Sequence, residues 1–271
     1  MLFLVLMVLV PFLFWRGTWF GRPLSEKETG QYLGDTQRPR RIQHALVQIA
    51  ERIQRGETEV KRWYPQIQAL AAHERPEVRS TVAWVMGRDN QSEEFHETLG
   101  RLLRDPDPSV RHNAALSLVR FGDASGRQEL RQMLLPYAVS APRHGVLVIR
   151  LKEENPVNSG TLLGRIQAGE EVGELRSPLP GAVRHWQFKN GEIVRTGDVV
   201  VFLSPSEDHV WEALRALYLV GQTEDLEAVE PFARGVAGMP ERIQQQARLT
   251  LEAIRRRAGE ENQTQGGSGP G

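Results

Sequence analysis

Ala141-Pro142-Arg143-His144-Gly145 and Ser177-Pro178-Leu179-Pro180-Gly181 are two versions of one short motif, and they decide the fold of the central part of this chain. Each is followed by a second matching stretch, which begins at Val157 after the first motif and at Val194 after the second. The motifs lie 36 residues apart and the stretches behind them 37 apart, so one inserted residue relates the two copies. Residues 140–203 are therefore expected to fold from two similar halves.

The same region carries the pattern of short β-strands. The β-prone runs are Gly145-Val146-Leu147-Val148-Ile149, Thr161-Leu162-Leu163, Ala182-Val183 and Val199-Val200-Val201-Phe202-Leu203. Turn-forming triplets such as Asn158-Ser159-Gly160 and Thr196-Gly197-Asp198 separate them. This spacing predicts a small all-β sandwich or barrel over residues 138–206.

The duplicated motifs resemble biotinyl- or lipoyl-attachment domains, which are barrel-sandwich hybrids with a cofactor-bearing lysine at a hairpin tip. Aligned without gaps, the attachment position falls on Glu170, within Ile166-Gln167-Ala168-Gly169-Glu170-Glu171-Val172. A glutamate has no amine to acylate. The resemblance therefore implies that the fold is kept, the attachment lysine is lost and no cofactor is carried, with modification of Lys152 or Lys189 as an alternative.

Outside this region the chain has helical periodicity. From Pro39 to Arg55 the apolar residues follow one helix face, Thr58 to Ala72 repeats the pattern, and Ser25 with Glu28 forms a candidate capping box. Pro76-Glu77-Val78-Arg79 and Pro108-Ser109-Val110-Arg111 then recur 32 residues apart. These repeats resemble HEAT repeats, which stack pairs of helices into an α-solenoid.

The helical pattern resumes after the β segment. Further helices are expected over Ser125–Leu135, His209–Val220 and Glu224–Ala233, and from Pro240 onward. The first two of these would form one helix pair, so the β module is interpreted as an insertion within a repeat. The expected fold is mainly α, a HEAT-like solenoid over 22–137 and 207–258, with the β domain at 138–206 and a disordered tail at 259–271.

The first residues form a candidate membrane anchor. Leu2 to Trp15 is uncharged and almost wholly apolar, and a transmembrane helix over 2–21 reaches the length that a bilayer requires. Trp15, Arg16, Trp19 and Phe20 would lie at the membrane interface. A cleaved signal peptide is the main alternative, but the basic start and small-residue cleavage site of such peptides are missing here.

We expect a single-pass protein of a bacterial inner membrane. Basic residues follow the apolar segment, which favours a cytoplasmic location for the bulk of the chain. Adaptor proteins with lipoyl-like modules lie on the outer side, so that resemblance favours the periplasm instead. The side of the membrane therefore stays open.

Composition excludes several functions. With 34 basic and 34 acidic residues the chain is neutral, which disfavours nucleic-acid binding, and its lack of cysteine excludes thiolate chemistry. The seven histidines include no i, i+3 or i, i+4 pair, so a metal site on one helix is unsupported. Motifs for phosphate loops, nucleophile elbows and dinucleotide binding are also missing from the sequence. We therefore expect neither an enzyme nor a small-molecule substrate, metal or cofactor.

Several residues are candidates for interfaces. They are Trp63, His185 and Trp186 for protein contacts, and Arg38, Arg40 and Arg41 for contacts with lipid headgroups or proteins. The alternative for Trp63 and Trp186 is burial in a core. For the arginines it is an ordinary polar helix start.

The leading functional hypothesis is a non-enzymatic scaffold, assembly factor or accessory subunit of a larger membrane complex. HEAT-like arrays and the β module would both serve as docking surfaces for protein partners, and the N-terminal helix would contact lipid. The alternative is a periplasmic-adaptor-like component of an export system. Such adaptors usually carry a long helical hairpin between the half-motifs, and only Gln167 to Arg176 is available here.

Overall fold

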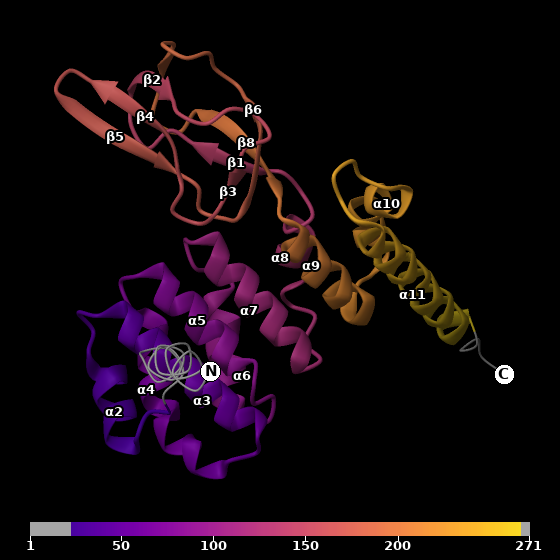
Figure 1. The fold of residues 1–271 in the computed structure, drawn as a ribbon. Helices are drawn as coiled ribbons and strands as arrows, with labels where there is room; N and C mark the ends of the chain where they lie inside the picture. Colours follow the sequence, from indigo (N-terminus) through magenta and orange to yellow (C-terminus); the bar gives the residue numbers. More distant parts are fainter. Residues whose placement is uncertain (1–22, 267–271) are drawn as a thin grey trace, which may run out of the picture. The chain divides into compact units, whose positions relative to one another are not determined.

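The computed structural model describes residues 23–266, and its chain divides into one compact unit that ends at Thr98 and a second that begins at Leu99 (Figure 1). Each unit is described by itself. The predicted membrane segment at 2–21 lies outside the described residues. Within residues 23–266, no helix combines the length and apolar character that a membrane span requires.

The first unit begins with the predicted capping box. Ser25 precedes helix α2 (Glu26–Gly34), its hydroxyl accepts the Glu28 backbone N–H, and the Glu28 carboxylate accepts the Ser25 backbone N–H at 2.9 Å. Helix α3 (Pro39–Gln54) follows, with its predicted face of Ile42, Leu46 and Ile49 fully buried. Both predicted helices are confirmed.

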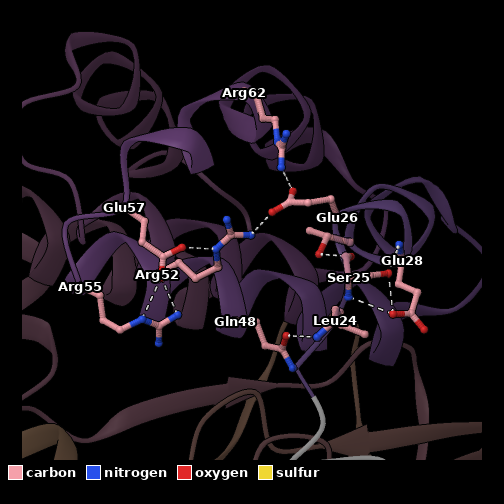
Figure 2. A network of polar contacts seen from close by, with 10 residues as sticks. Leu24, Ser25, Glu26, Glu28, Gln48, Arg52, Arg55, Glu57 and Arg62 are labelled. Atoms are coloured by element: carbon pink, nitrogen blue, oxygen red, sulfur yellow. Dashed lines mark hydrogen bonds and ion pairs between the residues drawn. The ribbon is translucent and has the colours of Figure 1, made fainter.

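A polar network fixes the start of α2 against α3 (Figure 2). The Leu24 backbone N–H donates to the Gln48 side-chain oxygen at 2.7 Å. Arg52 of α3 pairs with Glu26 at 2.8 Å and with Glu57 at 2.7 Å. Because the start of α2 lies beside the second half of α3, the two helices run antiparallel.

The expected helix over Thr58–Ala72 is interrupted. The structure has a 3₁₀ helix η1 (Thr58–Trp63), a short α4 (Tyr64–Ala69) and a 3₁₀ turn η2 (Leu70–Ala72). Pro65 supplies the physical reason: proline has no N–H to continue a helix and is tolerated only in a first turn, so a new helix begins around it. Helices α5 (Pro76–Met86) and α6 (Glu93–Leu102) complete this part.

The repeated Val-Arg motif has the same role in both copies. Arg79 donates to the backbone carbonyls of His73 and Glu74 at 2.8 and 3.1 Å. Arg111, on α7 (Pro108–Arg120), donates to the carbonyls of Asp105 and Pro106 at 2.9 and 3.2 Å. Each arginine thus donates hydrogen bonds to the backbone carbonyls of the turn that precedes its own helix. This role explains why the motif includes arginine at this position.

In the second unit, two helices that are distant in sequence form a pair. Helix α8 (Arg127–Gln132) packs against α9 (Glu207–Val220), and Leu130 of α8 shares one buried core with Leu214 and Leu217 of α9. Helix α10 (Leu226–Arg234) packs on α11 (Glu241–Gly266) beside them. The strands lie between α8 and α9 in sequence, as predicted for an insertion.

Helix α11 continues into the segment that was expected to form a disordered tail, residues 259–271. The helix ends at Gly266, past Arg257, and its last turns consist of polar residues and glycine. A helix that is already nucleated adds residues at little further entropic cost, so a polar Glu/Asn/Gln run can extend it. Residues 267–271 lie outside the described part of the chain.

The inserted segment forms eight strands in two antiparallel sheets. They are β1 (Tyr137–Ser140), β2 (Gly145–Ile149), β3 (Pro156–Val157), β4 (Leu162–Ala168), β5 (Glu171–Arg176), β6 (Gly181–Trp186), β7 (Ile193–Val194) and β8 (Val199–Pro205). The sheet orders are β1-β8-β6-β3 and β5-β4-β2-β7. A small β module is thereby confirmed. Among these described strands neither sheet closes into a barrel, because β1, β3, β5 and β7 remain as edges.

The two sheets are related by the duplication seen in the sequence. Each strand of the first half, β1 to β4, has a counterpart in the second half, β5 to β8. When every strand is exchanged for its counterpart, the strand order of one sheet becomes that of the other. The loops match as well: Ala141 N–H donates to the Asp198 carbonyl and Ser177 N–H to the Thr161 carbonyl, both at 2.8 Å. Each sheet contains strands of both halves, so the halves are interlocked and pseudo-symmetric.

Two glycines permit a close approach of neighbouring strands within each half. Gly145 has a φ of +153°, and a Cβ there would collide with the Gln167 carbonyl. Gly181 occupies the matching position, where a Cβ would collide with the Ser204 carbonyl. The glycine shared by both motifs is therefore required because strand backbones approach too closely for any side chain.

We predict that Gly145→Ala lowers the free energy of unfolding by about 2 kcal/mol or more, because it adds a backbone clash to an unfavourable φ. Gly100→Ala is the control, since Gly100 lies in α6 with open space around it. That change should be neutral or slightly stabilising. Chemical denaturation measures both, and equal stability of the two variants would contradict the assignment.

Candidate docking surfaces

The β4–β5 hairpin presents Glu170 at its tip. Ala168 pairs with Glu171, which leaves Gly169 and Glu170 as the two turn residues, and Gly169 has a φ of +63°. Glu170 is exposed. Strand β4 belongs to the first half and β5 to the second, so Glu170 lies at the junction of the halves. Its side chain has no amine that could form an amide with a cofactor.

Arg143 supports this hairpin from the first motif. Its guanidinium pairs with the Glu171 carboxylate, and its aliphatic carbons lie close to Gly173 on β5. Hydrogen bonding from Arg143 and its positive charge lower the pKa of Glu171. Arg143 therefore holds the first loop against the hairpin beside its tip.

Three exposed β-branched residues form a row across one sheet. Val172 of β5 and Val146 of β2 are both register partners of Gln167 on β4, and Val146 also pairs with Ile193 of β7. The exposed fractions are 50% for Val172, 37% for Val146 and 65% for Ile193. The row is interrupted only by the exposed Gln167, which lies between Val172 and Val146, and exposed apolar side chains grouped on a sheet face are typical of interaction surfaces. We call Val146, Val172 and Ile193 the apolar row.

Trp186, a candidate for protein contacts, lies beside an irregularity in strand β6. A bulge between Val183 and His185 shifts the register, so that strict alternation of faces fails across it. Trp186 packs against the β core with Val183, and its indole N–H donates to the Leu151 carbonyl at 3.1 Å. His185 stacks on Phe202 with ring centroids 4.9 Å apart. Both residues therefore contribute contacts within the module.

Trp63 lies half-buried on the inner side of the first unit. Its ring approaches Gly30 of α2 so closely that a Cβ there would be 3.0 Å from an indole carbon. The Arg62 guanidinium lies 5.1 Å from the ring centroid on the outer side. The hypothesis of an interface anchor required exposure of this ring, and the structure instead gives Trp63 packing contacts between α2 and η1.

The three candidate arginines do come together, and a fourth joins them. Arg38, Arg40 and Arg41 line a cleft with Arg75 and Glu77 from the start of α5. Sequence reasoning missed Arg75, although a signal was present: Arg38-Pro39 and Arg75-Pro76 both mark a helix start. The predicted membrane-interface residues, Trp15, Arg16, Trp19 and Phe20, lie outside the described part of the chain.

A buried histidine pair was also missed. His112 of α7 and His209 of α9 meet edge-to-face with ring centroids 5.6 Å apart, where the helices approach Tyr137 and Leu203 of the β module. His112 is only 4% exposed and lies 3.9 Å from Glu129. Burial, together with the positive charges of His209 and Arg111, lowers the pKa of His112 to about 3. Burial also lowers the pKa of His209.

We predict that this pair makes the second unit sensitive to acid. The unfolded chain binds a proton at His112 below about pH 6.5, whereas the folded chain keeps the ring neutral until much lower pH. The free energy of unfolding should therefore fall as the pH falls, by up to roughly 2 kcal/mol by about pH 5. Denaturant titrations at several pH values measure this slope.

His112→Gln should flatten the slope between pH 6.5 and 5, and His144→Gln, at an exposed loop position, should leave it unchanged. An unaltered slope in the His112 variant would show that other groups cause the acid sensitivity.

Among the described residues, no three histidine or carboxylate side chains are grouped so that they could hold a metal ion.

Comparison with known proteins gives a family match for one stretch of the helical part. Residues 65–140 match the family model for HEAT repeats. No curated protein matches the chain. Among solved structures, one similar chain is described as a single-chain, multi-domain long-chain acyl-CoA carboxylase, with 25% sequence identity. The match covers 36% of this chain and 10% of that one at a TM-score of 0.24, which does not establish a shared overall fold.

Proposed function

We propose that this protein is a non-enzymatic scaffold or accessory subunit that docks partner proteins of a membrane complex. The observation that carries the proposal is the HEAT-repeat array, an architecture commonly used to hold protein partners, which carries an inserted β module with an exposed apolar row. Contacts with partners would use both surfaces. Association with lipid would use the apolar N-terminal segment.

We further propose that the β module descends from a biotinyl- or lipoyl-attachment domain. The exchange of strands between two matching halves supports this origin, as does the position of Glu170 on the turn between them. With glutamate at the tip, the module would keep the recognition surface of a carrier domain without its cofactor arm. The two-residue turn leaves no place for the helical hairpin of export adaptors, so the scaffold is preferred to the adaptor.

Membrane attachment would restrain the first unit closely. The network around Leu24, Glu26 and Arg52 fixes the chain just after the apolar segment, so little slack separates that segment from the helices (Figure 2). We propose a single-pass inner-membrane protein with its bulk in the cytoplasm. Tags at both termini, read by protease accessibility in intact and opened cells, test this orientation.

We predict that the apolar row contributes to partner binding. Full-length protein purified in mild detergent should retain a membrane partner, and the double variant Val146→Lys/Val172→Lys should retain at least tenfold less, because charges would be buried at the contact. Quantitative mass spectrometry of the co-purified proteins measures this. Val47→Lys, at 39% exposure on α3, is the matched control and should keep the partner.

Failure of the unmodified protein to retain any stable partner would contradict the scaffold proposal. Equal retention of the partner by the unmodified protein, the double variant and the Val47 variant would show that the apolar row takes no part in partner binding.

We predict that a lysine at the hairpin tip restores carrier chemistry. Glu170→Lys, co-expressed with a biotin or lipoate ligase, should gain the mass of one biotinyl or lipoyl group, because such ligases recognise a lysine on an exposed hairpin tip. The original protein and Glu174→Lys, which lies on β5 away from the turn, should gain none. Intact mass spectrometry decides the matter, and an unmodified Glu170→Lys chain would count against descent from a carrier domain.

A further inference from the structure

A positively charged cleft opens between the first turns of two helices in the first unit. Its volume is about 610 Å³, and it is lined by Arg38, Pro39, Arg40, Arg41, Arg75 and Glu77. Four arginines and one glutamate thus contribute to the lining. A volume of this size accommodates several residues of a bound chain or a drug-sized molecule.

The backbone adds to the positive charge of the cleft. Helix α3 has 16 residues and begins at Pro39, and α5 has 11 residues and begins at Pro76, so the positive ends of two helix dipoles border the same space. Arg38 and Arg75 precede these prolines, and neither N-cap side chain bonds to its own helix. The guanidinium groups are thereby left to project from the two helix starts.

His73 holds the two sides of the cleft at a fixed spacing. Its Nδ1 accepts the Arg75 backbone N–H at 3.0 Å, so its Nε2 carries the proton and donates to the Thr36 carbonyl at 3.3 Å. This buried ring therefore joins the loop before α3 to the loop before α5. Gln43 adds a second tie by donating to the Glu77 carbonyl at 3.2 Å. These hydrogen bonds connect the two sides of the cleft.

The positive charge is only partly neutralised within the chain. Asp35 is shared by Arg38 at 3.7 Å and Arg41 at 3.1 Å, while Arg75 has Glu74 at 3.7 Å. Among the described residues, Arg40 has no ion-pair or hydrogen-bond partner through its side chain. Arginine presents a planar fork that matches carboxylates in pairs of hydrogen bonds, so an acidic ligand suits this surface.

The location of the cleft favours a protein over a lipid ligand. Leu24, where the chain enters from the apolar segment, lies beside Gln48, whereas the cleft lies at the opposite end of the nine-residue helix α2, about 13 Å away. The arginines are spread over the starts of two helices, α3 and α5, around a concave space that Glu77 also lines. A spread arrangement suits several carboxylates along a chain better than one compact phosphate headgroup.

We propose that this cleft binds an acidic segment of a partner protein, with Arg40 and Arg75 as the principal contacts from its two sides. The inference rests on the scaffold function proposed above and specifies the chemistry of one partner contact.

Binding of labelled peptides to the full-length chain in neutral-lipid nanodiscs tests the proposal. The probes are a ten-residue peptide rich in aspartate and glutamate, its asparagine/glutamine counterpart, and vesicles of phosphatidylcholine with or without phosphatidylserine. Arg40→Glu/Arg75→Glu is the test variant. Arg184→Glu, an exposed position on β6, is the control for a general change of charge.

The acidic peptide should bind, its amide counterpart should not, and the double variant should bind at least about tenfold more weakly while the Arg184 variant binds normally. Circular dichroism confirms that the variants are folded. Absence of binding, or equal weakening by the Arg184 control, would overturn the proposal. Binding only to the phosphatidylserine vesicles, with loss in the double variant, would assign the cleft to lipid instead. If the peptide binds but no partner protein co-purifies, the result would contradict the proposed scaffold function and would still support binding of an acidic segment in the cleft.

Discussion

The pairing of β1 with β8 returns the chain to the place where it left the helices. Tyr137 follows α8 closely and is the register partner of Leu203, which lies shortly before α9. Since paired residues of antiparallel strands are about 5 Å apart, the entry and exit of the β module are adjacent. Helices α8 and α9 can therefore pack as a pair, as the two helices of a repeat do, although the whole module lies between them in sequence.

Within the module, the same backbone problem is solved twice. Gly145 and Gly181 each allow a strand of one half to lie against the backbone of a neighbouring strand, and the loops around Ala141 and Ser177 bond in the same way. The helical repeats show a similar duplication, because Arg79 and Arg111 donate hydrogen bonds to backbone carbonyls of equivalent turns. In the helical repeats, the repeated arginine provides hydrogen bonds to backbone carbonyls. In the β module, the repeated glycine leaves room for a neighbouring backbone.

These local causes explain what the sequence could predict. Helix starts were recognised from proline and from the Ser25–Glu28 pair, and the halves of the β module from their glycines, because each signal acts within a few residues. The bulge at His185 was missed, since it depends on how β6 pairs with β8. The break at Pro65 and the extension of α11 to Gly266 were missed because isolated periodicity does not determine where a helix ends.

Long-range contacts set the limit for the candidate sites. His112 and His209 lie on helices separated by the whole β module, and Arg75 joins Arg38, Arg40 and Arg41 only because α5 begins beside α3. No pattern within a single segment predicts either meeting. By contrast, Glu170 was singled out by the resemblance to attachment domains, and in the structure it lies on the turn between β4 and β5.

Replacement of residues 138–204 by a short glycine-serine link tests most directly whether the β module is an insertion into a continuous helical array. Hydrogen exchange of the shortened chain should show α8 and α9 still protected together, because their ends are already adjacent and their shared core remains. Loss of protection across α8, α9, α10 and α11 would contradict the account, since it would mean that the strands, and not the helix pair, hold that part of the molecule together.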